Sequence, residues 1–175
     1  MSIQELEEII EQYGTDVMSF CGYLTGDKLL AEELYQDVFL TALEHKESVQ
    51  VEENVKSYLL SVAVRLWQNR RRKFAWRRRI APTMSIHQVD ETICDHTDNV
   101  ETDILEKYIS EEEKTLLREA VSHLKEELRI PVYLYYVNDL SVGDIANILG
   151  IPQGTVKSRL STARKKLRKE LEERI

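Results

Sequence analysis

The spacing of the apolar residues is the feature that most constrains the fold of this chain. Over residues 3–24, again over 28–45, and from residue 54 onward, apolar side chains recur every three or four positions, which is the period of one helix face. No strand-length stretch alternates valine, isoleucine or threonine with polar residues. Only six glycines and three prolines occur in 175 residues, so turn signals are few. The sequence therefore predicts an all-α protein.

The charged residues fall into alternating blocks. Residues 1–55 hold 13 acidic and 2 basic side chains, and residues 81–130 hold 13 acidic and 5 basic ones. By contrast, residues 65–79 hold 8 basic and no acidic side chains, and residues 152–175 hold 8 basic and 3 acidic ones. Two basic blocks in a chain of net charge −7 predict two separate surfaces that face nucleic-acid phosphates. For the C-terminal block alone, a solvated helix face is an alternative explanation.

Two small helical domains joined by a linker are predicted. Three helices with short connections before residue 80 suggest a bundle with antiparallel neighbours. Residues 81–108 lose the helical period and are rich in threonine and aspartate, as a linker is. Helical spacing then resumes after Ser110, which together with Glu113 fits a capping box. We therefore expect domains at 1–80 and 109–175 with a flexible acidic linker at 81–108.

Residues 140–167 predict a helix-turn-helix. Ser141 is suited to cap a short helix, and Gly150 supplies the left-handed residue that a tight corner between helices requires. The buried face of the short helix is expected to hold Ile145, Ala146 and Leu149. The buried face of the second helix is expected to hold Val156, Leu160, Ala163 and Leu167.

The second helix of this motif has the composition of a helix that reads DNA. A helix presented to the major groove requires polar side chains near its N-terminus and cations on its flanks. The residues that remain exposed or flanking are Gln153, Thr155, Lys157, Ser158, Arg159, Ser161, Thr162, Arg164 and Lys165. A generic corner between two helices would explain Gly150 and the lysines but not the polar first turn. Which residues touch bases and which touch phosphates stays open.

These motifs resemble a known family. LSVGDIANILGIPQGTVKSRLSTARKKLRKEL closely resembles the −35-reading domain of extracytoplasmic-function (ECF) sigma factors, group IV of the sigma-70 family, and HLKEELRIPVYLYYVNDLS resembles that domain's leading helices. GDKLLAEELYQDVFLTAL is similar to the family's polymerase-binding helix, and NVKSYLLSVAVRLWQNRRRK to its −10-reading helix. The resemblance implies an alternative sigma factor that binds core RNA polymerase and directs promoter-specific transcription initiation.

The resemblance implies roles for three sets of residues. For −35 recognition these are Gln153, Gly154, Thr155, Lys157, Ser158, Arg159, Thr162 and Arg164. For −10 recognition and strand opening they are Lys56, Tyr58, Arg65, Trp67, Asn69, Arg70, Arg72 and Lys73, where Arg65 and Asn69 replace the Asn and Asp of many members. For docking on the clamp coiled coil of the β′ subunit they are Glu33, Leu34, Gln36, Asp37, Phe39 and Leu40.

The residue types fit these roles. Glu32, Glu33 and Asp37 give an acidic face suited to a basic partner, with Leu34 and Phe39 as apolar anchors, although a solvated helix face would have the same composition. Aromatic stacking beside cations is what holding a single strand demands, and three aromatic residues interleave with the eight cations of 65–79: Trp67, Phe74 and Trp76. Tyr58 suits a base face, but its spacing also suits a core position.

The resemblance also implies partners. These are core RNA polymerase (β′ clamp coiled coil and β flap), promoter DNA and a membrane-anchored anti-sigma factor, with no cofactor, metal or catalytic residue. We expect a cytoplasmic chain without membrane insertion, because no stretch approaches about 18 apolar residues and the N-terminus is acidic where a signal peptide is basic. Cys21 and Cys94 lack metal-type spacing and are expected to be reduced thiols.

Two other classes of protein are alternatives. A stand-alone helix-turn-helix regulator would need a dimer interface or an effector pocket outside the reading head, and RRRKFAWRRR is no smooth dimerisation face. A metal-dependent nuclease would have to use a cluster within the linker, namely His87, Cys94 and His96 beside Asp90, Glu91, Asp95 and Asp98. A linker offers no scaffold to hold that geometry, so catalysis is the weakest hypothesis.

Overall fold

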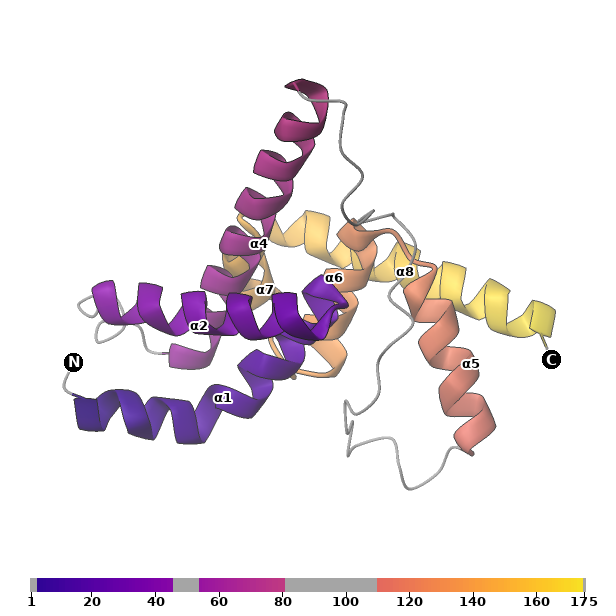
Figure 1. Cartoon of the computed structure of the whole chain (residues 1–175). Helices are drawn as coiled ribbons and strands as arrows, with labels where there is room; N and C mark the ends of the chain where they lie inside the picture. Colours follow the sequence, from indigo (N-terminus) through magenta and orange to yellow (C-terminus); the bar gives the residue numbers. More distant parts are fainter. Residues whose placement is uncertain (1–2, 46–53, 81–109, 175) are drawn as a thin grey trace. The chain divides into compact units, whose positions relative to one another are not determined.

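The computed structural model describes residues 3–45, 54–80 and 110–174. Within these ranges it contains α1 (Ile3–Thr25), α2 (Lys28–Glu44), α4 (Val55–Ile80), α5 (Glu111–Ser122), α6 (Glu126–Tyr136), α7 (Val142–Leu149) and α8 (Gln153–Arg174) (Figure 1). The described residues form no strand, and the all-α prediction is confirmed. None of these helices is long and apolar enough to span a membrane.

The chain divides into two compact units, Met1–Thr97 and Asp98–Ile175. The first contains α1, α2 and α4, which pack against one another, and the second contains α5 to α8. The linker predicted at 81–108 lies outside the described residues, so its boundaries stay a prediction.

The core of the first unit follows the apolar period of its helices. Its fully buried side chains come from all three helices and include Val17, Phe20, Cys21, Leu34, Val38, Leu59, Leu60 and Val62. Burying a large apolar side chain stabilises a fold by about 1.5–3 kcal/mol, so this shared core accounts for the packing of the three helices.

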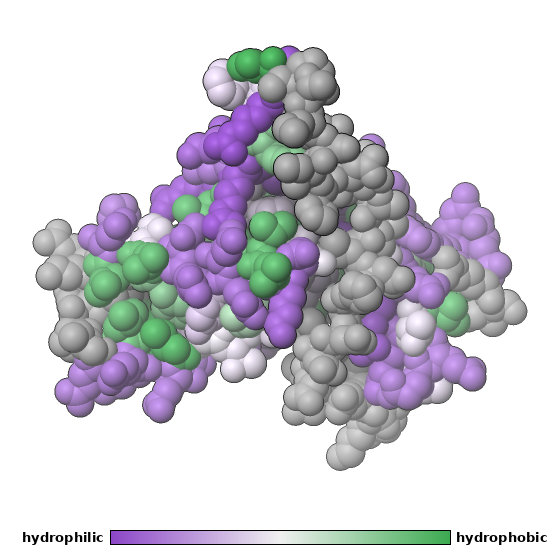
Figure 2. All heavy atoms as spheres, viewed as in Figure 1, coloured by the Kyte–Doolittle hydropathy of each residue, from purple (hydrophilic) through white to green (hydrophobic). Residues whose placement is uncertain are grey.

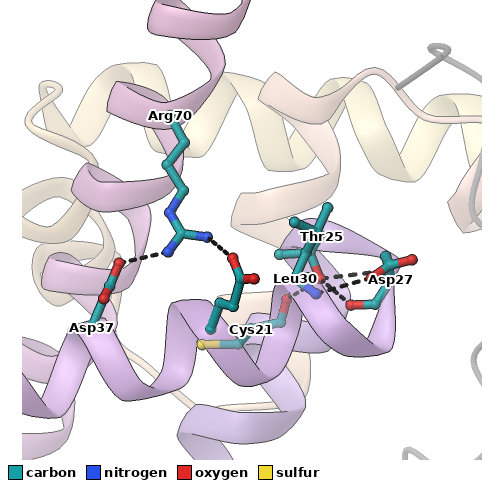
Figure 3. Close-up of polar contacts among 7 residues, drawn as sticks. Cys21, Thr25, Asp27, Leu30, Asp37 and Arg70 are labelled. Carbon is teal, nitrogen blue, oxygen red and sulfur yellow. Dashed lines mark hydrogen bonds and ion pairs between the residues drawn. The ribbon is translucent and has the colours of Figure 1, made fainter. Parts of the chain in front are cut away.

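The corner between α1 and α2 is closed by short-range hydrogen bonds. The backbone N–H of Leu30 donates to the carboxylate of Asp27 at 2.9 Å, which caps α2 (Figure 3). Thr25 Oγ1 donates to the carbonyl of Cys21 at 2.9 Å and so satisfies one of the last carbonyls of α1. Gly26, at φ +62°, takes the left-handed backbone that the turn requires.

Caps that the sequence predicted define the helices of the second unit. The N–H of Glu113 donates to Ser110 Oγ at 3.2 Å and the N–H of Ser110 donates to the Glu113 carboxylate at 2.8 Å, so the capping box is confirmed.

Pro131 lies inside α6, where it is buried. His123 Nδ1 lies 2.6 Å from a carboxylate oxygen of Glu170, which connects the end of α5 to α8.

Candidate nucleic-acid interface

The corner between α7 and α8 has the predicted geometry. The N–H of Asp144 donates to Ser141 Oγ at 3.1 Å, and Gly150 ends α7 at φ +64° and ψ +35°. The N–H of Ile151 then donates back to the carbonyl of Ala146 at 3.1 Å. A residue with a Cβ would be strained at Gly150, so the sequence enforces a sharp turn before α8 begins.

One position of this motif was predicted incorrectly. Ile148 is buried at 7% exposure, whereas Leu149, which was expected in the core, is only half-buried. Ile148 follows Ile145 by three residues, so both lie on the face of α7 that meets the core. Leu149 lies about 100° further round the helix, at the edge of that face.

Helix α8 separates an apolar face from a polar one. Val156, Leu160 and Ala163 are at most 2% exposed, and Leu167 is half-buried. The predicted −35 residues lie on the remaining surface: Gln153, Gly154, Lys157, Ser158, Thr162 and Arg164 are exposed, while Thr155 and Arg159 are half-buried. The first two turns of α8 thus present polar side chains to solvent and are anchored by the apolar face below.

The last ten residues of α4 form an exposed cationic helix end. Every described side chain from Arg71 to Ile80 is exposed, and Figure 2 shows mostly hydrophilic residues along this end of the helix. Two aromatic rings accompany the cations there, Phe74 at 38% and Trp76 at 64% exposure. Exposed aromatic faces beside cations suit the stacking of unpaired bases.

Trp67 does not belong to that surface. It is 7% exposed and lies on the buried face of α4, three residues after Val64 and seven after Leu60. Its ring is therefore part of the bundle core, and the expectation that Trp67 stacks on a base is not supported by its position. Phe74 and Trp76 are the accessible aromatic residues of α4.

Arg70 is bound within the bundle. Its guanidinium lies 2.5 Å from the carboxylate of Asp37 and 3.5 Å from that of Glu33, both on α2 (Figure 3). The side chain is 31% exposed, so water screens the pair in part. Arg70 was predicted to contact DNA, but in this structure it joins α4 to α2.

The other residues predicted for −10 recognition lie in different surroundings. Lys56 forms an ion pair with Asp16 of α1 at 2.5 Å. The side-chain oxygen of Asn69 accepts a hydrogen bond from Arg72. Tyr58 is half-buried, and Arg65, Arg72 and Lys73 are exposed. The exposed cations of this predicted set thus extend along α4 toward the helix end that carries Phe74 and Trp76.

Helix α2 exposes only part of the set of residues predicted for docking. Leu34 is fully buried and Phe39 is 6% exposed, with its ring 4.8 Å from that of Tyr35. Both face the bundle because they share a face with the buried residues Ala31, Val38 and Ala42. They cannot serve as anchors for a partner while the bundle is folded.

The exposed face of α2 is nevertheless partly apolar. Leu40 is 57% exposed, Leu43 is 39% exposed, and sequence reasoning missed Leu29, which is 70% exposed. Glu33 and Gln36 are exposed between these leucines. The spacing of 29, 33, 36, 40 and 43 was the signal that could have revealed this face, since it is itself a helical period.

Two family models match the two units of the chain. The family described as "Sigma-70 region 2" matches residues 9–78, and that described as "Sigma-70, region 4" matches residues 114–167. The chain is 26% identical over 168 residues to the ECF RNA polymerase sigma factor SigW of Bacillus subtilis, covering 94% of this chain and 87% of that protein. It is 28% identical to the ECF RNA polymerase sigma factor SigM of the same organism, covering 93% of both.

A solved structure shares the fold. The sigma factor RpoE of Bartonella quintana, crystallised with the anti-sigma factor NepR, is 21% identical to this chain with a TM-score of 0.74, and the match covers 97% of this chain and 98% of that one.

The matches bear on the alternative classes and on the identity of the chain. The match to Sigma-70 region 2 over residues 9–78 contradicts the hypothesis of a stand-alone regulator, because region 2 belongs to sigma factors. The residues of the metal hypothesis lie outside the described part of the chain, and the described residues contain no group of three or more potential metal ligands. The chain belongs to the sigma-70 family as an ECF sigma factor, a non-enzymatic protein that directs RNA polymerase to promoters.

Proposed function

We propose that the two units of this sigma factor carry out different steps of promoter recognition. The second unit reads the −35 element with α8 and contacts the β flap of the polymerase. The first unit docks on the β′ clamp coiled coil through α2 and recognises and opens the −10 region with α4. The observation that carries this proposal is that each unit has one exposed helix surface of the required chemistry: a polar first turn on α8 and an aromatic, cationic end on α4.

The proposal for −35 reading rests on the first two turns of α8. Lys157 and Ser158 are exposed one turn after the helix start, where a recognition helix meets base edges. The hydroxyl of Ser158 donates to the carbonyl of Thr155 at 2.9 Å, which leaves its oxygen lone pairs as acceptors. Half-buried Arg159 lies at the flank of this surface and fits a phosphate contact.

The proposal for −10 opening rests on the end of α4. Its exposed cations attract the strands, and Trp76 offers an accessible ring on which an unpaired base can stack. Such stacking contributes about 1–3 kcal/mol per base. Arg65, Arg72 and Lys73 extend the cationic surface along the helix.

The proposal for polymerase docking rests on the exposed face of α2. Leu40 is the most exposed of the predicted docking residues that are apolar, and Glu33 and Gln36 lie on the same face. An apolar anchor beside an acidic group suits a partner with an apolar pocket and a basic rim. We replace Leu34 and Phe39 as anchors by Leu40, with Leu29 and Leu43 at the ends of the face.

Family membership supports three further proposals. A membrane-anchored anti-sigma factor would hold the chain inactive by covering the same surfaces. The protein would act in the cytoplasm, because core RNA polymerase and the chromosome are there. It would require no cofactor of its own.

Run-off transcription tests the proposed function. Core polymerase is incubated with promoter-bearing DNA fragments with and without the full chain, and promoter-specific products are expected only with it. Lys157→Ala should weaken initiation from −35-dependent promoters about tenfold, whereas Lys169→Ala, an exposed lysine far from the first turn, should have little effect. Absence of any promoter-specific product would refute the proposal.

A binding measurement tests the docking face separately. Leu40→Asp should abolish assembly with core polymerase, whereas Leu40→Met, which keeps an apolar side chain of similar volume, should preserve it. Equal binding by both variants would exclude Leu40 as an anchor.

A further inference from the structure

An arginine of α8 is held in place by the neighbouring helix α6. Arg164 Nε donates a hydrogen bond of 2.8 Å to the phenolic oxygen of Tyr136, the last residue of α6. The guanidinium carbon also lies 5.9 Å from the ring centroids of both Tyr135 and Tyr136. The two rings pack edge to face, with centroids 5.0 Å apart. Contacts from α6 thus restrict the orientation of the guanidinium.

This cluster faces solvent. Tyr136 is 52% exposed and Arg164 is exposed as well. The hydrogen bond between them uses one of the five guanidinium N–H groups and leaves the phenolic hydrogen available as a donor. The pair can therefore present several donors to one acceptor.

The position of Arg164 suits a backbone phosphate. It lies seven residues after Lys157 and four before Arg168, so the three cations share one face of α8. At about 1.5 Å per residue, Arg164 lies about 16 Å along the axis from the start of the helix. If the first turns of α8 enter the groove, a side chain this far along reaches the sugar-phosphate backbone rather than base edges.

We propose that Tyr136 and Arg164 together form a phosphate-binding site at the edge of the −35 interface. The hydroxyl of Tyr136 donates to a phosphate oxygen while its own oxygen accepts from Arg164 and orients the guanidinium toward the same phosphate. Because the guanidinium is already restricted in the free protein, less conformational entropy is lost on binding. The inference rests on the proposed reading of DNA by α8 and adds a residue from outside the helix-turn-helix.

The test uses holoenzyme assembled from core polymerase and the full chain. The probe is a promoter duplex selected by the wild-type holoenzyme from a random-sequence library, with single phosphates of the −35 region replaced by uncharged methylphosphonates. Tyr136→Phe should lower affinity about three- to tenfold without changing base preference. The matched control is Tyr135→Phe, which lacks the hydroxyl of the neighbouring ring and should stay within about twofold of wild type.

The salt dependence separates the two members of the pair. Arg164→Gln should reduce the slope of log affinity against log salt by about 0.9, because one phosphate contact by a cation is lost. Tyr136→Phe removes no charge and should keep the wild-type slope. Arg164→Lys, which retains charge without the planar fork, should also keep the slope but should no longer respond to Tyr136→Phe.

The methylphosphonate scan decides the inference. At one phosphate, the methylphosphonate substitution should weaken DNA binding by the wild-type holoenzyme. The same substitution should not weaken binding by Arg164→Gln further. It should weaken binding by Tyr136→Phe less than it weakens binding by the wild type. If Tyr136→Phe and Tyr135→Phe respond alike at every phosphate, Tyr136 only packs and the inference fails. A wild-type holoenzyme that shows no preference for any −35 sequence would instead refute the proposed reading by α8.

Discussion

The guanidinium of Arg70 on α4 lies 2.5 Å from the carboxylate of Asp37 on α2. The pair joins the helix proposed to dock on polymerase to the helix proposed to meet the −10 region. It also removes one arginine from the eight cations of residues 65–79 that composition assigned to DNA. The effective cationic surface of α4 therefore lies further toward its C-terminal end.

We expect the Arg70–Asp37 pair to stabilise the first unit modestly. A double-mutant cycle of Arg70→Gln and Asp37→Asn should give a coupling energy of about 0.5–1 kcal/mol, because both side chains are partly exposed. Both tryptophans of the chain lie on α4, so tryptophan fluorescence in urea reports on this unit. Arg72→Gln, at an exposed cation of the same helix, is the control for the loss of one positive charge. A coupling energy near zero between Arg70 and Asp37 would contradict the prediction.

The two tryptophans should respond differently to substitution. Trp67→Ala should destabilise the first unit by about 3–5 kcal/mol because the ring is buried. Trp76→Ala should change stability by less than about 0.5 kcal/mol but should impair promoter opening, measured by permanganate reactivity of unpaired thymines. Normal opening by a folded Trp76→Ala variant would argue against the proposed stacking role.

Two glycines of α1 provide a matched pair. A Cβ at Gly22 meets no atom within 4 Å, so Gly22→Ala should stabilise α1 by about 0.5–1 kcal/mol. A Cβ at Gly14 would lie 2.9 Å from the hydroxyl oxygen of Tyr35, so Gly14→Ala should stabilise less or destabilise. Tyr35→Phe removes that oxygen and should restore the missing stabilisation. If Gly14→Ala changes the unfolding free energy equally in the wild-type and Tyr35→Phe backgrounds, the contact between the added Cβ and the Tyr35 hydroxyl does not destabilise the protein.

Stability of the first unit should fall at alkaline pH because of Cys21. Burial raises the pKa of its thiol from 9.0 to about 12, and nearby Arg70 offsets this in part. A group whose pKa is raised in the folded state stabilises the fold below its unfolded pKa and loses that contribution as pH rises above it. Between pH 9 and 10 the unfolding free energy should therefore begin to fall, toward a limiting slope of about 1.4 kcal/mol per pH unit.

Cys21→Ala is the control for this titration. It should reduce the slope between pH 9 and 10, below the ordinary pKa of tyrosine. Burial also raises the pKa of Tyr35, which adds a loss of the same sign at higher pH. An unchanged slope in Cys21→Ala would assign the alkaline loss to other groups.

Two residues of the second unit that have a positive φ should respond differently to substitution. Gly150→Ala places a Cβ at φ +64° and should destabilise the corner by about 1 kcal/mol. Asp139 adopts φ +53°, which a side chain tolerates poorly, so Asp139→Gly should be neutral or stabilising. Amide hydrogen exchange of α7 measures both, and faster exchange in Asp139→Gly would contradict the strain argument.

Local features were predictable from the sequence to a large extent. The helix positions agree with the apolar spacing to within a few residues, and the caps at Ser110, Ser141 and Gly150 are as expected. Each of these depends on residues within about four positions of one another, so neighbouring sequence determines it. The separation of polar and apolar faces on α8 was predictable for the same reason.

The direction in which individual side chains of α2 and α4 point was decided by tertiary structure. A stretch with apolar residues on more than one face, such as Leu34, Phe39 and Leu40, does not reveal which face will be covered. The placement of α1 and α4 against α2 covers Leu34 and Phe39 and leaves Leu40 exposed.

The same reasoning applies to the aromatic and charged residues of α4. Trp67 and Trp76 lie in one basic stretch and are equivalent by composition, but only Trp67 lies where α4 packs against the bundle. The carboxylate partner of Arg70, Asp37, lies 33 positions earlier in the chain. The sequence by itself determined which helices form and where they turn, because hydrogen bonds and caps are local. Which of their side chains remain available to polymerase and DNA was decided by packing between helices distant in sequence.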